Sequence, residues 1–529
     1  MSLTKYKHIG FSAATGSLLL IGLVLLLNGT LQVARADPGN LFVSPNGNGD
    51  CSQGSPCDLQ TALGTASDSD TIYLAQGTYT GTGGAIITAT KSITFLGGWD
   101  GAPGGAVVRD PDTYTTILDG ENARRVVYIN GAVAPVFQGL TLQRGNAAGL
   151  GGDPSMPTTD FGGAVYANSA SPTITNCRIV SSSAGFGGGM ALYYGSPVVA
   201  NSEIVSNTAS QDIGGGVIRG GGGGIFLYQS PATIAGNLVA HNVASGIDLT
   251  FDGGGGLYLD TSAATILSNT IQGNYGNPNG GGIYLWDSAA TIRQNLIQDN
   301  NAGSNVGGGI VVGLSAANIE GNVIFRNGSP SIGGGVFISG SPGFTMTNNI
   351  LAENSAVGYA PALFIAEYQP LVGPGQPCQG TLLHNTFADN NSPSPWMIHV
   401  GGTSSSPYLT TVAFTNTLVD KPGGIYVDAA GIVTLDTTLW DPALLLQPGL
   451  TVSGTGTIVS STNYYSTPLL ARPSFHLDPC SPAIDRGTDA GVTVDIDGDP
   501  RPIGVLPDIG ADEARRWTFL PLAMRNHGP

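Results

Sequence analysis

The sequence predicts an all-β protein built as a right-handed parallel β-helix, a solenoid of about 10–12 coils with an N-terminal cap and a small C-terminal module of strands and loops. Two observations predict this fold. A glycine-rich phrase followed by a short apolar strand recurs seven times, with strand starts 25 to 35 residues apart. A second phrase, I-x-x-N-x-I-x-x-N, runs in step with the first. A unit of this length cannot bury its own apolar face, so the copies must stack.

The strand after the glycines alternates between two sets of side chains. The inward column is expected to hold Val165, Met190, Ile225, Leu257, Ile283, Ile310 and Val336. The adjacent outward column holds Tyr166, Ala191, Phe226, Tyr258, Tyr284, Val311 and Phe337, and the next one Asn168, Tyr193, Tyr228, Asp260, Trp286, Gly313 and Ser339. Because coils stack about 4.8 Å apart, we expect a row of aromatic rings along one exterior face.

The second phrase places asparagines at fixed positions in successive coils. The copies contain Asn237 and Asn242, Asn269 and Asn274, Asn295 and Asn300, Asn322 and Asn327, Asn349 and Asn354, then Asn385 and Asn390. Asparagine tolerates the left-handed backbone of a sharp corner, and its amide can bond to the asparagine one coil away. Each coil is therefore expected to contain three short strands and an Asn-turned corner. Cys177 fills the first Asn position of an earlier coil, which predicts a buried, neutral thiol.

Over residues 125–420 the repeat resembles the right-handed parallel β-helix repeat family, the group that includes pectate lyases. The segment LFVSPNGNGDCSQGSPCDLQTALGTASDSDTIYLAQGTY is similar to the N-terminal entry of that family, where an amphipathic stretch caps the open end. The resemblance implies a cap with the first coils over 37–124, repeats over 125–420 and terminal coils over 421–477. Residues 478–513, with SPAID, DIDGDPRP and DIGADE, resemble an anchor-type module that follows β-helices in bacterial surface proteins, and 514–529 form a tail.

The first 36 residues are typical of a secretory signal. Lys5 and Lys7 precede an apolar run over 17–28, and an A-x-A site ends at Ala36. A retained N-terminal anchor is the alternative. We therefore expect a secreted or cell-surface protein whose mature chain has no transmembrane segment and is a monomer.

The charge balance excludes one class of partner. Removing the signal, with Lys5, Lys7 and Arg35, takes the formal net charge from −17 to −20. Proteins that bind nucleic acid need basic patches to displace phosphate counterions. The expected partner is an extracellular polysaccharide or a component of the cell envelope.

Cysteines and tail carboxylates suggest crosslinks and one cation. Export permits disulfides, so we expect Cys51 to pair with Cys57 and Cys378 to pair with Cys480. Asp495, Asp497 and Asp499 alternate like calcium ligands. Pro500 stands where a calcium loop would have glycine, so a turn in which these carboxylates pair with Arg501 is the alternative. Calcium is the only cofactor that the sequence suggests.

The outward aromatic face is the candidate binding surface, because stacked aromatics beside carboxylates suit sugar rings. The residues expected to bind carbohydrate are Tyr193, Phe226, Tyr228, Tyr258, Asp260, Tyr284 and Trp286. Long insertions over 145–161, 208–221 and 243–253 precede this face, and the family resemblance implies a substrate groove there. Candidate catalytic residues are Asp212, Arg219, Asp248, Asp252 and Asp260.

Two other functions compete with carbohydrate binding. A lyase or glycoside hydrolase would use the loop carboxylates and Arg219, and a hydrolase needs two carboxylates about 5–9.5 Å apart. The galacturonase words N-T-D and G-H-G are absent from the sequence. A structural or adhesive spacer would have no glycan ligand, and insertions packed down over the aromatics would favour it.

Overall fold

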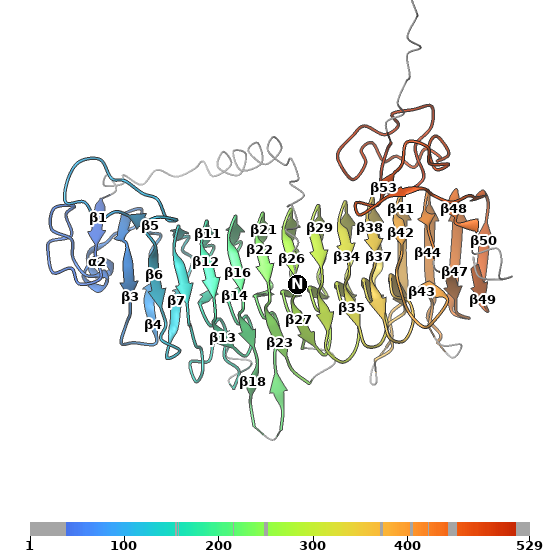
Figure 1. Ribbon diagram of the computed structural model, residues 1–529. Helices are drawn as coiled ribbons and strands as arrows, with labels where there is room; N and C mark the ends of the chain where they lie inside the picture. Colours follow the sequence, from blue (N-terminus) through green and yellow to red (C-terminus); the bar gives the residue numbers. More distant parts are fainter. Residues whose placement is uncertain are drawn as a thin grey trace, which may run out of the picture.

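The computed structural model describes residues 39–514, apart from 154–155, 157, 215, 248–251, 371–373, 403–405, 422 and 443–451. The expected signal over 1–36 and all of the expected tail except its first residue lie outside the described residues. The described chain winds into an elongated parallel β-helix (Figure 1). Among the described residues, no helix combines the length and apolar character that a membrane crossing requires.

Three long parallel sheets form the walls of the solenoid. Sheet 1 contains β1 (Asn40–Val43), β2 (Thr71–Ala75), β5 (Thr94–Trp99), β8 (Val136–Gln138), β11 (Thr173–Thr175), β15 (Val198–Ala200), β21 (Thr233–Ala235), β25 (Thr265–Leu267), β29 (Thr291–Arg293), β33 (Asn318–Glu320), β37 (Pro342–Thr347), β41 (Cys378–Leu383), β44 (Thr410–Thr415), β47 (Gly431–Asp436) and β50 (Thr457–Ser460). Sheet 2 contains the strands that follow the glycines: β4 (Ala85–Ala89), β7 (Arg125–Asn130), β10 (Val165–Asn168), β14 (Met190–Tyr193), β20 (Ile225–Tyr228), β24 (Leu257–Asp260), β28 (Ile283–Trp286), β32 (Ile310–Gly313), β36 (Val336–Ser339), β40 (Leu363–Ala366), β43 (Trp396–Val400), β46 (Gly424–Val427) and β49 (Val452–Gly454).

Sheet 3 contains β3 (Gly77–Tyr79), β6 (Thr116–Asp119), β9 (Thr141–Gln143), β12 (Arg178–Val180), β16 (Glu203–Val205), β22 (Leu238–Ala240), β26 (Thr270–Gln272), β30 (Leu296–Gln298), β34 (Val323–Phe325), β38 (Ile350–Ala352), β42 (Thr386–Ala388), β45 (Leu418–Val419), β48 (Thr438–Trp440) and β51 (Asn463–Tyr465). A shorter sheet 4 follows sheet 3 in the middle coils: β13 (Ser183–Ala184), β17 (Thr208–Ala209), β23 (Val243–Ser245), β27 (Tyr275–Asn277), β31 (Asn301–Ala302), β35 (Gly328–Ser329) and β39 (Ser355–Ala356).

The solenoid is longer than the sequence repeat predicts. Its three long sheets have 15, 13 and 14 strands among the described residues, which exceeds the expected 10–12 coils. The additional coils lie at both ends, where loops replace the glycine phrase while the strands still pair in register. The last coil strand, β51, ends at Tyr465, and the antiparallel hairpin of β52 (Leu470–Ala471) and β53 (His476–Leu477) lies with the C-terminal module rather than with the coils.

Inward side chains and asparagine ladders hold the coils together. The inward column after the glycines, such as Leu257 and Ile283, is fully buried in the main apolar core. Asn269 Nδ2 donates to Asn295 Oδ1 at 3.0 Å, and Asn295 Nδ2 donates to Asn322 Oδ1 at 3.0 Å. A second ladder joins Asn274 to Asn300 at 2.9 Å. Each ladder satisfies buried polar groups at a corner where the sheet hydrogen bonds are interrupted.

We expected the ladder asparagine to adopt the left-handed backbone at each corner. In the structure, the residue before the asparagine adopts it instead. Ser268 has φ 53° and Gln294 has φ 56°, and each precedes a ladder asparagine. His241 occupies the same position, with φ 55°, and is therefore a corner residue. Asparagine is required here for its side chain, which bonds along the stack, and not for its backbone.

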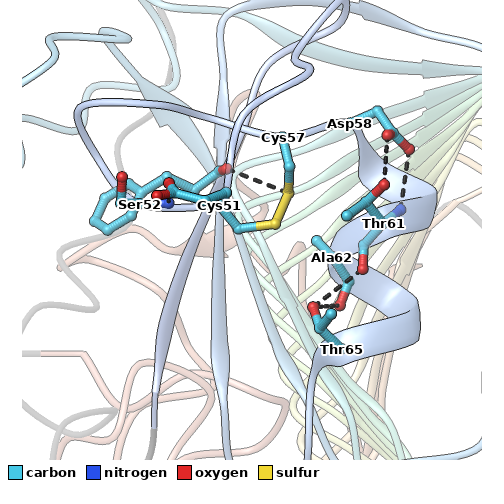
Figure 2. The surroundings of a disulfide bond; sticks show 9 residues. Cys51, Ser52, Cys57, Asp58, Thr61, Ala62 and Thr65 are labelled. Atoms are coloured by element: carbon cyan, nitrogen blue, oxygen red, sulfur yellow. Dashed lines mark hydrogen bonds between the residues drawn. A yellow bond between two sulfur atoms is a disulfide. The ribbon is translucent and has the colours of Figure 1, made fainter.

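The N-terminal end of the solenoid is closed by α2 (Leu59–Thr65), whose Leu59 and Ala62 are buried. Asp58 caps this helix by accepting from the Thr61 N–H at 3.0 Å. A disulfide joins Cys51 to Cys57 directly before the helix (Figure 2). The expected pairing of Cys378 with Cys480 does not form. Cys378 lies buried at the start of β41, whereas Cys480 is exposed on the module.

Cys177 and Cys378, the two buried cysteines outside the disulfide, have unreactive thiols. Burial raises the pKa of Cys177 to about 11, and its thiol lies 3.5 Å from the Phe137 carbonyl oxygen. Burial raises the pKa of Cys378 to about 12. Both groups are therefore neutral at physiological pH.

The C-terminal module packs against the outer surface of sheet 3 (Figure 1). Two apolar clusters make the contact, one built from Ile350, Ala352, Ala388, Phe475, Ile496 and Ala511, the other from Leu418, Leu439, Leu477, Ala483, Ile484 and Ile509. Hydrogen bonds add to it: the Ala511 N–H donates to Thr386 Oγ1 at 3.0 Å. The module is therefore part of the folded body of the protein.

Candidate functional site

The outward column of sheet 2 forms the continuous aromatic row that the repeat predicts. Phe226, Tyr258 and Tyr284 are register partners on successive coils. The Phe226 and Tyr258 ring centroids lie 5.2 Å apart, and those of Tyr258 and Tyr284 lie 4.8 Å apart. These rings belong to a second apolar cluster that is separate from the core inside the solenoid. The shared wall that the candidate site requires is therefore present.

Most of this row is buried, which contradicts the expectation of exposed stacking rings. Tyr193, Phe226, Tyr258 and Tyr284 have at most 2 % of their surface exposed. Phe161 and Phe186, which directly precede two glycine phrases, cover the N-terminal part of the row, and Phe186 lies 5.0 Å from Phe226. Four of the seven residues expected to bind carbohydrate therefore pack within the protein. In the sequence, only the shared position of Phe161 and Phe186 directly before the glycines marks them, and it does not indicate the direction in which their rings fold.

The other three expected residues remain half-buried. Tyr228, Asp260 and Trp286 occupy the next outward column, one residue beyond the inward Leu227, Leu259 and Leu285. The neighbouring Tyr194 is 50 % exposed, and its ring lies 5.5 Å from Tyr228. These side chains form the accessible edge of the aromatic row.

The insertions place the candidate catalytic residues in different surroundings. Asp212 is exposed on β18 (Gln211–Asp212), which pairs with β19 (Ile218–Arg219) in a hairpin that projects from the solenoid (Figure 1). Asp252 is fully buried and accepts from the Gly220 and Ile247 N–H groups, each at 3.0 Å, so it holds two insertions together. Asp248 lies outside the described residues.

Arg219 and Asp260 are brought together at one hollow. It has a volume of about 190 Å³ and is lined by Met156, Phe186, Arg219, Phe226, Tyr258 and Asp260. Met156 comes from the first insertion and Arg219 from the second, while Phe226, Tyr258 and Asp260 come from β20 and β24. The hollow therefore combines an aromatic floor, one cation and one carboxyl group.

The surroundings of Asp260 in this hollow change the pKa of its carboxyl group. Burial raises the pKa of Asp260, and the charge of Asp287 on the next coil raises it further, against a hydrogen bond from Thr261 at 2.8 Å. Burial raises the pKa of the neighbouring Tyr193, to which the charge of Asp260 adds, and the Tyr193 hydroxyl has no hydrogen-bond partner among the described residues. A half-buried carboxyl group in an apolar hollow favours its neutral, hydrogen-donating form.

Asp495, Asp497 and Asp499 do not form a group of possible metal ligands among the described residues. Asp495 uses Oδ1 to accept from the Asp497 and Asp499 N–H groups, at 2.9 and 2.8 Å, and Oδ2 to accept from the Glu513 N–H at 2.9 Å. Asp497 instead forms an ion pair with His476 at 3.0 Å. Arg501, the alternative partner, pairs with Glu513 at 3.0 Å. Asp495 therefore shapes the loop, with its oxygens turned to the backbone.

Three possible metal ligands that the sequence did not predict as a group lie beside this loop. His476, Asp497 and Asp512 each offer one ligand atom, and these atoms lie within 4.8 Å of one another. Asp512 also accepts from the Leu477 N–H at 2.7 Å. The ion pair and this hydrogen bond account for the arrangement as a structural contact inside the module.

Several solved structures match this chain at low similarity. The pectate lyase Pel9A matches with a TM-score of 0.39 and 15 % identity, covering 91 % of this chain and 98 % of that one. The catalytic unit of a GH87 α-1,3-glucanase from Streptomyces thermodiastaticus matches with a TM-score of 0.36 and 14 % identity over 83 % of this chain and 70 % of that one. An alginate lyase from Paenibacillus sp. gives 0.19 and 14 %, over 80 % and 99 %.

Sequence comparison gives the family. No curated protein matches the chain. The pattern of the family described as "Right handed beta helix region" matches residues 158–324, 212–362 and 248–439, which together span more than half of the 529 residues. These matches cover the coils that carry the glycine phrases, the asparagine ladders and the aromatic row. The chain belongs to the right-handed β-helix family.

Proposed function

We propose that this chain is an exported protein that binds one sugar unit of an extracellular polysaccharide in the hollow between Arg219 and Asp260. The observation that carries the proposal is the convergence of a cation and a carboxyl group, from an insertion and from β24, over an aromatic floor. Sites of this kind, apolar with a few convergent polar groups, are the usual form of small-ligand sites.

The dimensions and chemistry of the hollow suit a sugar ring. Drug-sized ligands occupy about 300–1,000 Å³, so a hollow of about 190 Å³ suits a single ring. The C–H face of the ring would contact the half-buried Met156 side chain, since Phe226 and Tyr258 line the hollow but are only 1 % exposed. Asp260 would bond to a hydroxyl, and Arg219 would bind a hydroxyl or the carboxylate of a uronic acid.

The binding test uses two substitutions in the mature chain, Arg219→Ala and Asp260→Asn. Calorimetric titration with polygalacturonate, alginate, xylan and β-glucan measures affinity. Arg219→Ala removes a charged hydrogen bond, worth about 1.5–3 kcal/mol, so we expect it to bind the recognised glycan on the order of tenfold or more weakly. Asp260→Asn removes the carboxyl proton that a sugar hydroxyl would accept, a neutral hydrogen bond worth about 1 kcal/mol, so we expect about fivefold weaker binding.

Arg178→Ala is the matched control. Its side chain is 56 % exposed and pairs with Glu203 on sheet 3, away from the hollow. This variant should bind as the wild type does. The proposal fails if the wild type binds none of the four glycans, or if both hollow variants bind with unchanged affinity.

Glycoside hydrolysis is a second candidate, favoured by the raised pKa of Asp260 and by the proximity of Asp287. A carboxyl group that stays protonated can act as a general acid, and a neighbouring carboxylate as a base. In that case new reducing ends should appear on incubation with the bound glycan, and both Asp260→Asn and Asp287→Asn should abolish them. Binding without new reducing ends would leave the chain as a binding protein only.

A further inference from the structure

The outward aromatic column continues past the glycine phrases. After Phe337 its register partners are Phe364 on β40, His399 on β43 and Tyr426 on β46. These coils lack the glycine phrase, so the repeat pattern did not reveal them. The column ends at a second hollow of about 260 Å³, lined by Gly358, Tyr359, Ser394, Trp396, His399 and Tyr426.

Unlike the rings of the first hollow, three of the rings around this hollow are accessible to solvent. Tyr359 is 38 % exposed, and Trp396 and Tyr426 are half-buried. The rings form a continuous wall: the His399 centroid lies 4.9 Å from Tyr359 and 5.1 Å from Tyr426, and Trp396 lies 5.6 Å from Tyr426. Aromatic rings with one face held by the protein and another free are able to stack on a ligand.

His399 supplies the polar group of this wall. Its ring is 7 % exposed, and Nε2 lies 2.7 Å from Asp428 Oδ2. When Asp428 accepts the Nε2 proton, Nδ1 becomes an acceptor for a hydroxyl. No lysine or arginine is found among the described residues that line the hollow. The wall therefore offers stacking and neutral hydrogen bonds, in contrast to the hollow that contains Arg219.

We infer that the hollow between Tyr359, Trp396 and Tyr426 is a second sugar-binding site, which takes an uncharged sugar ring stacked on Trp396 and Tyr426. The inference rests on the proposed function, because it assigns a second contact to the same glycan-binding face. It also names the class of sugar: a ring with hydroxyls and no carboxylate.

The spacing of the two hollows determines how long the ligand must be. Five coil steps of sheet 2 separate β24 from β43, which is about 24 Å at about 4.8 Å per coil. A trisaccharide reaches one hollow at a time, whereas a polysaccharide lying along the face reaches both. Linking two contacts on one chain raises the overall affinity above either contact alone.

The test compares Trp396→Ala and Tyr426→Ala with the wild type. Neutral trisaccharides of β-1,3-glucan, β-1,4-glucan, xylan and mannan are titrated by calorimetry against the full mature chain. We expect at least one trisaccharide to bind and each variant to bind it on the order of tenfold more weakly. Tyr465→Ala, at a tyrosine that is 47 % exposed on β51 in sheet 3, should bind as the wild type does. Thermal unfolding of all variants checks that they are folded.

The outcomes separate this inference from the proposed function. Arg219→Ala should leave trisaccharide binding at the second hollow unchanged, while a variant with both hollows altered should lose more polysaccharide affinity than either single variant. Trisaccharide binding that Trp396→Ala leaves intact, or no binding of any of the four, would overturn the inference. If Arg219→Ala lost trisaccharide binding while Trp396→Ala and Tyr426→Ala kept it, the sugar would bind in the first hollow. That outcome would support the proposed function and overturn this inference.

Discussion

The asparagines of the ladders act through their side chains. Asn295 is 2 % exposed, donates from Nδ2 to the Ile266 carbonyl at 2.9 Å, and accepts at Oδ1 from both the backbone and the side chain of Asn269, at 2.8 and 3.0 Å. On the following coil, Asn295 Nδ2 also donates to Asn322 Oδ1 at 3.0 Å. One amide thus serves buried groups of the coils on either side. An unsatisfied buried group costs more than a hydrogen bond gains.

Replacing Asn295 with alanine is therefore expected to destabilise the solenoid by about 3 kcal/mol, because it orphans the Asn269 N–H and the Ile266 carbonyl. The midpoint of chemical denaturation measures the change. Arg293→Ala, on the exposed side of the same coil, should change stability by less than about 0.5 kcal/mol. Equal effects of the two substitutions would show that the ladder contributes no special stability.

For individual residues, the sequence predicted which side of the sheet a side chain faces better than it predicted how exposed that side chain is. Alternation placed Tyr258 and Tyr284 outside the solenoid, as the structure confirms. It could not predict that Phe161 and Phe186 lie over the row, because their positions depend on the path of irregular loops. For the same reason Asp252 was expected to face a ligand, although its carboxylate bonds to two backbone N–H groups.

The cap is the element that depends on a covalent bond. The disulfide between Cys51 and Cys57 closes a short loop before α2, and both residues are at least 96 % buried. An uncapped coil end would expose the edges of the sheets, which invites association with other chains. The cap therefore protects the N-terminal end of the solenoid.

A double Cys51→Ser and Cys57→Ser variant should lose about 2 kcal/mol of local stability, since a loop of this length contributes roughly that amount through chain entropy. Faster hydrogen exchange in β1 and β2 measures the loss. Cys480→Ser, at an exposed free cysteine, is the control and should leave exchange unchanged. Unaltered exchange in the double variant would mean that apolar packing alone holds the cap.

At the scale of the whole molecule, buried polar groups join the module to the coils. His384, fully buried before β42, accepts from Asn416 at Nε2 at 2.8 Å, and its Nδ1 faces Arg501 at 2.8 Å and the Asp508 carbonyl at 3.2 Å. Arg501 in turn pairs with Glu513. Burial, with the charge of Arg501, lowers the pKa of His384 to about 3.

This lowered pKa predicts a loss of stability in acid. In the unfolded chain His384 takes up a proton near pH 6.5, whereas in the folded protein it stays neutral down to about pH 3. The contribution of His384 to the free energy of unfolding therefore falls as the pH decreases between these values. The loss is about 1.4 kcal/mol per pH unit. Burial raises the pKa of Glu513 to about 7 and of Asp508 to about 6, so these groups act in the opposite direction.

Comparison with His384→Asn isolates the histidine. The free energy of unfolding of the wild type, relative to that of this variant, should fall by as much as about 3 kcal/mol from pH 7 to pH 4. Denaturant titrations at several pH values measure the difference, in which the shared contributions of Glu513 and Asp508 largely cancel. A difference that stays constant with pH would contradict the prediction.

The sequence by itself determined the solenoid, its stacking register and the side of the wall on which each repeat residue lies. A periodic pattern suffices for this, because each coil contacts mainly its neighbours and places like residues side by side. The two ladders and the Phe226–Tyr258–Tyr284 row follow from that rule.

Only the tertiary structure decided which aromatics are accessible, that Arg219 and Asp260 share a hollow, and that the aromatic column continues to His399 and Tyr426. It also separated Cys378 from Cys480 and placed the module on sheet 3. These features depend on loops and on contacts between segments far apart in the chain, and no local repeat encodes such contacts.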